Sequence, residues 1–167
     1  MAILPIRFIP DSVLRVDCPE VTDFDDDLRR LVDDMVETMY AAPGVGLAAP
    51  QVGIEKRLAV VDVSVGNTEG ALKVLINPRI VSQEGKVTDF EGCLSIPDIS
   101  EKVARPRKIG VEAQDVNGER FSFETEDFEA RAVCHEVDHL DGVLFIDHLR
   151  GLRREKVKRQ IRKLGLA

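Results

Sequence analysis

Residues 127–142, DFEARAVCHEVDHLDG, contain two histidines four positions apart, His135 and His139. The segment has helical periodicity and Gly142 can end a helix, so we predict a helix over residues 127–141. At about 100° per residue, His139 lies roughly 40° around the axis from His135 and one turn along it. Both imidazoles can therefore reach one metal ion.

Glu136 completes the pattern H-E-x-x-H, which is typical of zinc hydrolases. It lies about 100° from His135, which suits a carboxylate that handles a water molecule without binding the metal. The same pattern also arises by chance in helices whose histidines are hydrogen-bonded core residues. Here Val133, Val137 and Leu140 form a separate apolar stripe that can pack on the core, which favours the metal site.

A catalytic site of this kind needs a third protein ligand and one open position. The longer pattern H-E-x-x-H-x-x-G-x-x-H is excluded, because Phe145 stands where its third histidine would lie. His148 comes three residues too late, and Glu155 lies in a basic segment. Cys93 is a better candidate, since a thiolate with two imidazoles suits a borderline metal ion. A lone cysteine is nevertheless more often a small buried core residue.

Residues 44–51, GVGLAAPQ, form a further segment of interest. Two glycines and several small residues favour an irregular backbone that other groups can approach closely, although a plain loop has the same composition. Gln51 adds an amide that can donate a hydrogen bond to a developing oxyanion.

The remaining elements follow an irregular order. A buried stripe predicts a helix over residues 24–42, and a last helix is expected over 153–164. Asn117-Gly118 predicts a two-residue type I′ hairpin that leads into a strand over 120–124. Three further apolar or alternating runs predict strands: residues 58–63, 73–80 and 109–113. Without regular βαβ alternation, we expect an α+β fold with antiparallel or mixed sheets around the histidine helix, and a C-terminal helix.

The composition narrows the functional classes. A length of 167 residues predicts a single domain over 1–167, and the net charge of −7 argues against a general nucleic-acid or anionic-membrane binder. No apolar run approaches the roughly 20 residues that a membrane-spanning helix needs. Three cysteines, an odd number, indicate a reducing compartment, and Cys18 and Cys134 are expected to be buried. We therefore expect a cytoplasmic protein that binds neither membranes nor specific DNA.

Three segments together resemble the motifs of the peptide deformylases. Residues 44–51 look like that family's G-x-G-L-A-A-x-Q, residues 91–95 like its E-G-C-L-S, and residues 135–139 like its H-E-x-D-H. The resemblance extends to residues 10–15 and 140–147, and so covers essentially the whole chain. The helical C-terminus resembles the bacterial type 1 branch.

The resemblance implies removal of the N-formyl group from the formyl-Met of newly made polypeptides, with release of formate. Glu136 would act as general base and then acid, while Gln51 and the backbone N–H of Leu94 would hold the oxyanion. The cofactor would be one divalent ion, Fe²⁺ in the cell, with Zn²⁺ or Ni²⁺ also expected in purified protein. The metal ligands that it implies are Cys93, His135 and His139.

The substrate is expected to lie between two segments. By resemblance, its backbone would run along Gly44, Val45 and Gly46. The Met side chain is expected against the histidine face of the helix over 127–141, because three residues fall within about 60° of His135 on the wheel. These are Phe128, Arg131 and Ala132.

Two other functions remain open from the residues alone. A zincin-like endopeptidase is favoured if Cys93 is a spectator, and a catalytically inactive, ribosome-associated binding protein would keep the fold. Intact Glu136 argues against the second of these. Residues 148–167 carry eight Lys/Arg and one Glu, whereas the rest of the chain is acidic. Such a basic helix is commonly just a solvated face, but it is also suited to docking on ribosomal phosphate.

Overall fold

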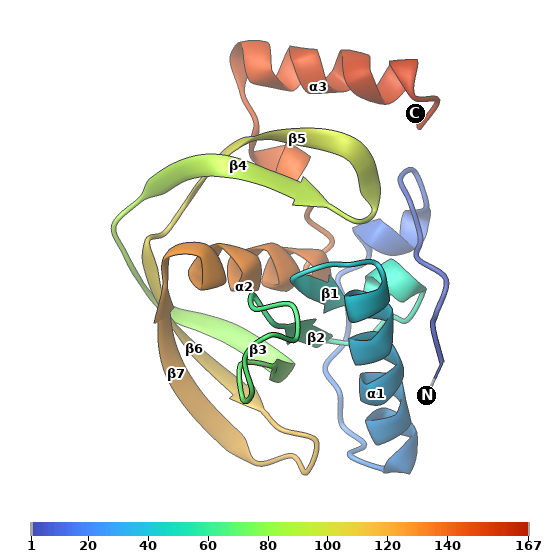
Figure 1. Cartoon of the computed structure of the whole chain (residues 1–167), viewed down its shortest axis with the longest axis vertical. Coiled ribbons are helices and arrows are strands. Elements are labelled where there is room, and N and C mark those ends of the chain that lie inside the picture. Colours follow the sequence, from blue (N-terminus) through green and yellow to red (C-terminus); the bar gives the residue numbers. More distant parts are fainter. Residues whose placement is uncertain (1, 167) are drawn as a thin grey trace.

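The computed structural model describes residues 2–166, in which two antiparallel sheets enclose a central helix (Figure 1). The helices are α1 (Asp26–Ala41), α2 (Asp127–Leu140) and α3 (Gly151–Lys163). The strands are β1 (Gly46–Ala48), β2 (Leu58–Val61), β3 (Lys73–Glu84), β4 (Val87–Cys93), β5 (Ile96–Arg105), β6 (Lys108–Gln114) and β7 (Arg120–Glu126). The predicted α+β class and the predicted helix over 127–141 are both confirmed.

The larger sheet has the order β1-β2-β3-β6-β7, and β4 pairs with β5 in a separate ribbon. Figure 1 shows α2 between these two layers, with α1 against the β1–β2 end and α3 beyond the ribbon. The strand β1 lies at one edge of this sheet, because only one side of β1 is paired with another strand, β2. Its other side is free to receive an extended peptide backbone.

Two hydrophobic clusters hold α2 in place. The predicted stripe residue Val133 packs with Ile109 and Val111 of the large sheet. On the ribbon side, Phe145 belongs to a second cluster, and its ring stacks on that of His135 with centroids 6.2 Å apart. Because both faces of α2 are covered, its histidines are buried and need specific partners.

The basic helix α3 packs on β5 through a narrow apolar side. Val157 and Ile161 are buried in the same cluster as Val103. Leu152, at the start of the helix, is 88% exposed. Every Lys and Arg of α3 is exposed. The helix therefore presents a basic outer surface on the side that faces away from the ribbon.

Several details differ from the sequence prediction. The strands β1, β4 and β5 were not predicted. Most of β4 is exposed and polar, so it lacks a buried face, and β1 is only three residues long. The strand β5 has an alternating buried face, but that face includes the charged residues Glu101 and Arg105, which hide the apolar pattern.

The prediction of a two-residue type I′ turn was wrong. The amide of Asp115 donates to Glu119 O, which closes a longer loop. The Asp115 carboxylate accepts from the amides of Asn117 and Glu119. That carboxylate stabilises a three-residue loop in which Gly118 has φ 81°.

The predicted burial of Cys18 and Cys134 is confirmed. Within the described residues, no helix is long and apolar enough to cross a membrane.

Candidate active site

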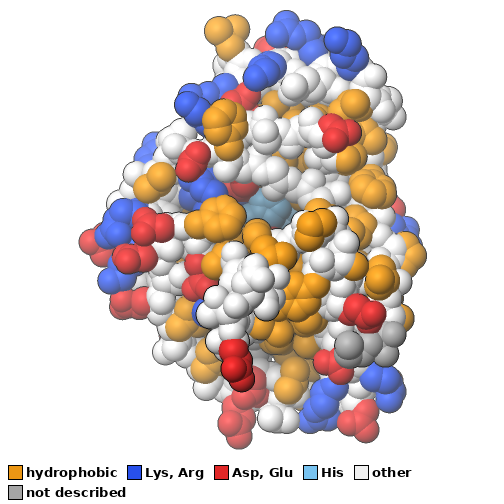
Figure 2. Space-filling model, viewed as in Figure 1, with side chains coloured by type: hydrophobic (Ala, Val, Ile, Leu, Met, Phe, Trp, Pro, Cys, Tyr) orange, Lys and Arg blue, Asp and Glu red, His pale blue; other side chains and the backbone are white. Residues whose placement is uncertain are grey.

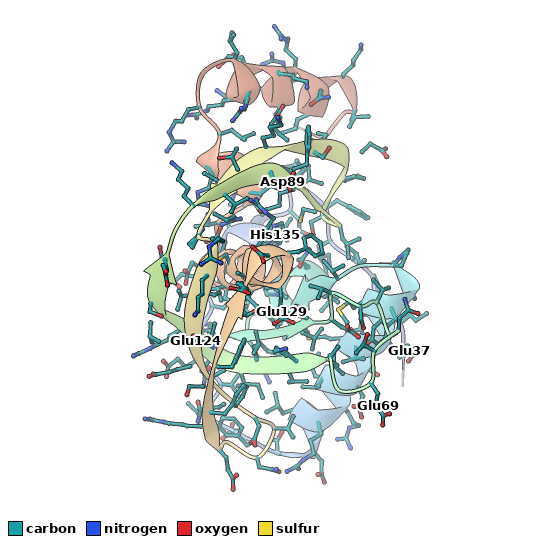
Figure 3. The ribbon with its side chains drawn as sticks, turned by 60° about the vertical axis from the view of Figure 1, so that its left-hand side comes forward. Glu37, Glu69, Asp89, Glu124, Glu129 and His135 are labelled. Atoms are coloured by element: carbon teal, nitrogen blue, oxygen red, sulfur yellow. The ribbon has the colours of Figure 1, made fainter. Side chains whose placement is uncertain are left out.

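Cys93 and the two histidines of α2 converge on one point. Cys93 Sγ, at the end of β4, lies 3.3 Å from His139 Nε2, which in turn lies 3.1 Å from His135 Nε2. The three ligand atoms all lie within 4.8 Å of one another. Figure 3 shows His135 on the side of α2 that faces the β4–β5 ribbon. One thiolate and two imidazoles that point inward in this way fit a single divalent ion.

Glu91 fixes the orientation of His135. The Nδ1 atom of His135 donates to Glu91 Oε2 over 2.7 Å, which leaves Nε2 facing Cys93 and His139. This carboxylate–histidine arrangement is common around protein-bound metals, because it sets both the tautomer and the ring plane. His139 Nδ1 has no hydrogen-bond partner within the described residues. Burial and the neighbouring His135 hold the pKa of His139 well below its usual range, so its Nε2 lone pair is available.

Two arginines complete the buried network around Glu91. Arg105 donates to both carboxylate oxygens over 3.0 and 2.6 Å, and Arg131 donates to Oε1 over 3.1 Å. Burial alone would raise the pKa of Glu91, but the hydrogen bonds from His135 and Arg105 hold it well below its usual range. Glu91 is therefore a fixed anion. Sequence reasoning did not single out Glu91 as a functional residue, although its place two residues before Cys93 was the available signal.

Glu136 lies beside the cluster as a buried carboxylate whose Oε1 atom has no hydrogen-bond partner in the described chain. Burial raises the pKa of Glu136 to about 7. A Cβ atom at Gly46 would lie 2.4 Å from Glu136 Oε2, so the carboxylate occupies the space that this glycine leaves open. The glycine of β1 and the glutamate of α2 are thus sterically matched.

Gln51 is held with its amide nitrogen toward Cys93. Its Oε1 accepts from the amide of Ala48 over 3.0 Å, which orients the side chain. Its Nε2 then donates to Ser95 Oγ over 3.2 Å and lies 3.6 Å from Cys93 Sγ. A donor of this kind, held next to the candidate ligands, is placed to bind a developing oxyanion.

A cavity of about 600 Å³ opens over these groups. Figure 2 shows the pale-blue histidine surface recessed near the middle of one face, bordered by hydrophobic side chains. The cavity is lined by all of the residues that the sequence proposed for the substrate: Gly44, Val45, Gly46, Phe128, Arg131 and Ala132. Leu94 and Gln51 also line it. The guanidinium of Arg131, however, is tied to Glu91 and to the carbonyls of Val103 and Val87.

The rejected third-ligand candidates lie apart from the cluster. His148 Nε2 is 2.7 Å from Asp138 Oδ2, and Glu155 is exposed on α3. Cys134, although adjacent to His135 in the chain, packs in the cluster between α2 and the large sheet. Burial raises the pKa of the Cys134 thiol to about 11, as expected for an unreactive core cysteine.

Comparisons with known proteins agree with this geometry. The family model described as polypeptide deformylase matches residues 3–155, and so ends within α3. The peptide deformylase of Acidobacterium capsulatum is 52% identical over all of this chain and 98% of its own. The crystal structure of a peptide deformylase from Legionella pneumophila superposes with a TM-score of 0.91 at 41% identity, covering 98% of this chain and 96% of the other. That of Synechococcus elongatus, a complex with actinonin, gives 0.92 at 40% identity, covering 98% and 89%.

Proposed function

The chain belongs to the peptide deformylase family, and from this premise we propose that Cys93, His135 and His139 hold its catalytic metal ion. As a member of the family it is a metal-dependent hydrolase that removes the N-formyl group from formyl-Met of newly made polypeptides. The observation that carries the residue assignment is the convergence of these three ligand atoms next to the buried carboxylate of Glu136.

The donor set also bears on which metal is bound. Thiolate and imidazole accept Fe²⁺, Zn²⁺ and Ni²⁺, and affinity generally rises from iron toward copper. We propose Fe²⁺ as the ion in the cell, with Zn²⁺ or Ni²⁺ replacing it in protein purified in air. Metal analysis of protein prepared without oxygen distinguishes these ions. The three free cysteines support the further proposal of a reducing, cytoplasmic setting. The length of 167 residues supports the proposal of a single catalytic domain.

The reaction follows from the positions of the side chains. When bound, a divalent ion supplies a Lewis acid for the formyl carbonyl and makes water a better nucleophile. Glu136 accepts the proton of the attacking water and later returns it to the departing amine. Gln51 Nε2 and the Leu94 amide donate hydrogen bonds to the oxyanion of the tetrahedral intermediate. The free edge of β1 pairs with the peptide backbone and aligns the formyl group.

Formate release provides the direct test of this function. We expect formate from formyl-Met-Ala-Ser and no cleavage of the same peptide without its formyl group. Cleavage of internal bonds in the unformylated peptide would instead identify a zincin-like endopeptidase. Binding of formylated peptide without turnover would identify an inactive binding protein.

Ala132 is proposed to line the pocket for the Met side chain. Replacing it with Leu adds apolar volume to the pocket wall, and overpacking of this kind costs roughly 1–3 kcal/mol. We expect kcat/KM for formyl-Met-Ala-Ser to fall about tenfold or more, through KM, with metal content unchanged. Formyl-Ala-Ala-Ser is the matched control, because its small side chain should be affected less. An equal loss on both substrates would place the Met pocket elsewhere.

The exposed basic side of α3 is proposed to dock on the ribosome, whose surface is rich in phosphate. Truncation after Gly151 is a poor test, since Val157 and Ile161 fill the cluster beneath the helix. We instead replace three exposed residues on one side of α3 with Gln, namely Arg154, Lys158 and Arg162.

The triple variant should lose weak, salt-sensitive ribosome binding in co-sedimentation and keep its activity on short peptides. A matched variant removes three exposed cations from the large sheet and its connections: Arg79, Lys86 and Arg120. This control lowers the net charge equally and should bind like the original chain. Equal affinity of all three proteins would show that α3 is only a solvated helix.

A further inference from the structure

His148 is the last residue of η3 (Phe145–His148), a single helical turn that follows α2. It lies outside the metal cluster, and its Nε2 atom donates to Asp138 Oδ2 over 2.7 Å. The chemistry proposed above therefore leaves this histidine without a role. The contacts around it, however, lead back to the metal cluster.

An unbroken series of polar contacts joins His148 to His135. Asp138 Oδ2 also accepts from Arg105 Nη1 over 2.6 Å. The same guanidinium donates to both oxygens of Glu91, and Glu91 accepts from His135 Nδ1. The side chains become less exposed along the way, from 39% for His148 and 22% for Asp138 to 8% or less for the other three. The series thus runs from the solvent to a proposed metal ligand.

Arg105 holds α2 at two positions through this series. It binds Asp138 directly and reaches His135 through Glu91. The two helix residues lie about 60° apart around the axis, so the two contacts together resist rotation of α2. Burial alone would lower the pKa of Arg105, but Glu91 and Asp138 raise it above its usual range. Arg105 is therefore a permanent cation between two acidic side chains.

The turn η3 contacts the same part of α2 with two of its side chains. Its first residue, Phe145, is buried and stacks on the ring of His135. Its last residue, His148, binds Asp138. Loss of the second contact would free the end of η3, and so would loosen the packing of Phe145 on the histidine ring.

Stability alone does not account for this series of charges. Buried ion pairs are costly to desolvate, and apolar side chains of similar size often replace them without loss of stability. Hydrogen bonds to a metal-binding histidine, by contrast, fix its tautomer and ring plane and raise the affinity for the metal. A series that ends on His135 is suited to this second purpose.

We propose that His148 is a positioning residue for the metal site. By fixing Asp138, it keeps Arg105 in place against Glu91. The ring of His135 is thereby held at one angle toward the ion. This inference rests on the proposed function, since it takes His135 as a ligand. It assigns neither proton transfer nor substrate contact to His148, which does not line the cavity.

Two substitutions separate the hydrogen bond of His148 from its shape. His148→Phe keeps a ring of similar size but cannot donate to Asp138. His148→Gln loses the ring, but its amide nitrogen can donate in place of Nε2. Loss of a direct partner of a ligand costs roughly 10–100-fold in metal affinity, and His148 is further away.

The first measurement is the release of bound Co²⁺ to a chelator, from protein loaded without oxygen. We expect His148→Phe to release the ion about three- to tenfold faster than the original chain, and His148→Gln to release it at nearly the original rate. Faster release from both variants to the same extent would reject the hydrogen bond as the cause.

Two further measurements report on the geometry of the site. The visible absorption bands of bound Co²⁺ depend on the positions of its ligands, so they should shift in His148→Phe and return in His148→Gln. KM for formyl-Met-Ala-Ser should stay unchanged, whereas the loss of activity should appear in kcat. A merely structural role would instead lower the unfolding temperature and leave the release rate and the spectrum as they are.

Lys73→Ala is the matched control. Lys73 Nζ contacts Glu129 of α2 over 3.1 Å, and this pair is exposed to a similar extent as His148 and Asp138. The variant therefore loses a comparable contact on the same helix, and it should release Co²⁺ at the original rate. Equal acceleration in Lys73→Ala and His148→Phe would reject the inference, because any loosening of α2 would then suffice.

A double variant tests the route. Asp138→Ala removes the partner of His148, so adding His148→Phe to it should accelerate the release of Co²⁺ no further. Additive effects would show that His148 does not act through Asp138, and would reject the inference. Should Asp138→Ala fail to fold, the comparison of His148→Phe with His148→Gln still decides the matter.

The outcomes separate this inference from the function on which it rests. An original chain that binds no Co²⁺ and releases no formate rejects the proposed function, and this inference with it. An active original chain whose release of Co²⁺ is unchanged in His148→Phe rejects the positioning role alone.

Discussion

Glu136→Gln is expected to lower kcat for formate release by at least about 10²–10⁴-fold, the range for loss of one general acid–base group. The loss should lie at the upper end, because the same side chain is proposed to accept a proton and then to return it. Gln is nearly isosteric and fits the space beside Gly46, so the fold and the metal cluster should survive. Kinetics and metal content measured on the same sample check both parts.

The pH profile adds a second signature of the same residue. A general base works when deprotonated, so kcat/KM should fall as the pH drops through the pKa of Glu136. Burial places that pKa at about 7 without an ion, and the positive charge of a bound ion moves it lower. The residual activity of Glu136→Gln should lack this acid limb.

Glu129→Gln is the control for Glu136→Gln. It makes the same change on the same helix, at a carboxylate that contacts Lys73 and Thr125 rather than the metal cluster. Its kcat should stay close to that of the original chain. Normal turnover in Glu136→Gln, or an equal loss in both variants, would remove Glu136 from the reaction.

The sequence predicted the central helix because its signals are local. His135 and His139 are one turn apart, and the apolar stripe that includes Val133 identifies the packed side. The structure adds that α2 is covered on its histidine side as well, by a ribbon whose first strand has little buried surface. An exposed, polar strand leaves no alternating pattern, so β4 could not be predicted from periodicity.

The candidate site was only partly predictable for a similar reason. Spacing on one helix suggested two ligands. Cys93, which lies 42 positions before His135, was only a candidate on its chemistry, and the family resemblance was needed to select it as the third. His135 is held by Glu91, which lies 44 positions before it, and Glu91 is held in turn by Arg105. Glu91 and Arg105 come from opposite strands of the ribbon, and only the folded chain brings them to α2. Long-range contacts of this kind have no signature in a single sequence.

The assignment of Cys93 leads to the second large effect. Cys93→Ser replaces a thiolate with a hydroxyl, which is a poor ligand for a borderline ion. Loss of a residue that merely supports a ligand already costs roughly 10–100-fold in metal affinity. We therefore expect loss of the ligand itself to weaken binding by more than about 100-fold and to abolish activity at low metal concentration.

Two measurements and one control make the result for Cys93 specific. Metal content after dialysis against a weak chelator should fall from one ion per chain to nearly none, and activity should return in part when excess metal is added. Cys134→Ala also removes a thiol, from the position next to His135, but this thiol packs against the large sheet. Its metal content should be unchanged. If Cys93→Ser also keeps its ion and its activity, Cys93 is not a metal ligand. The third ligand then lies elsewhere in this protein.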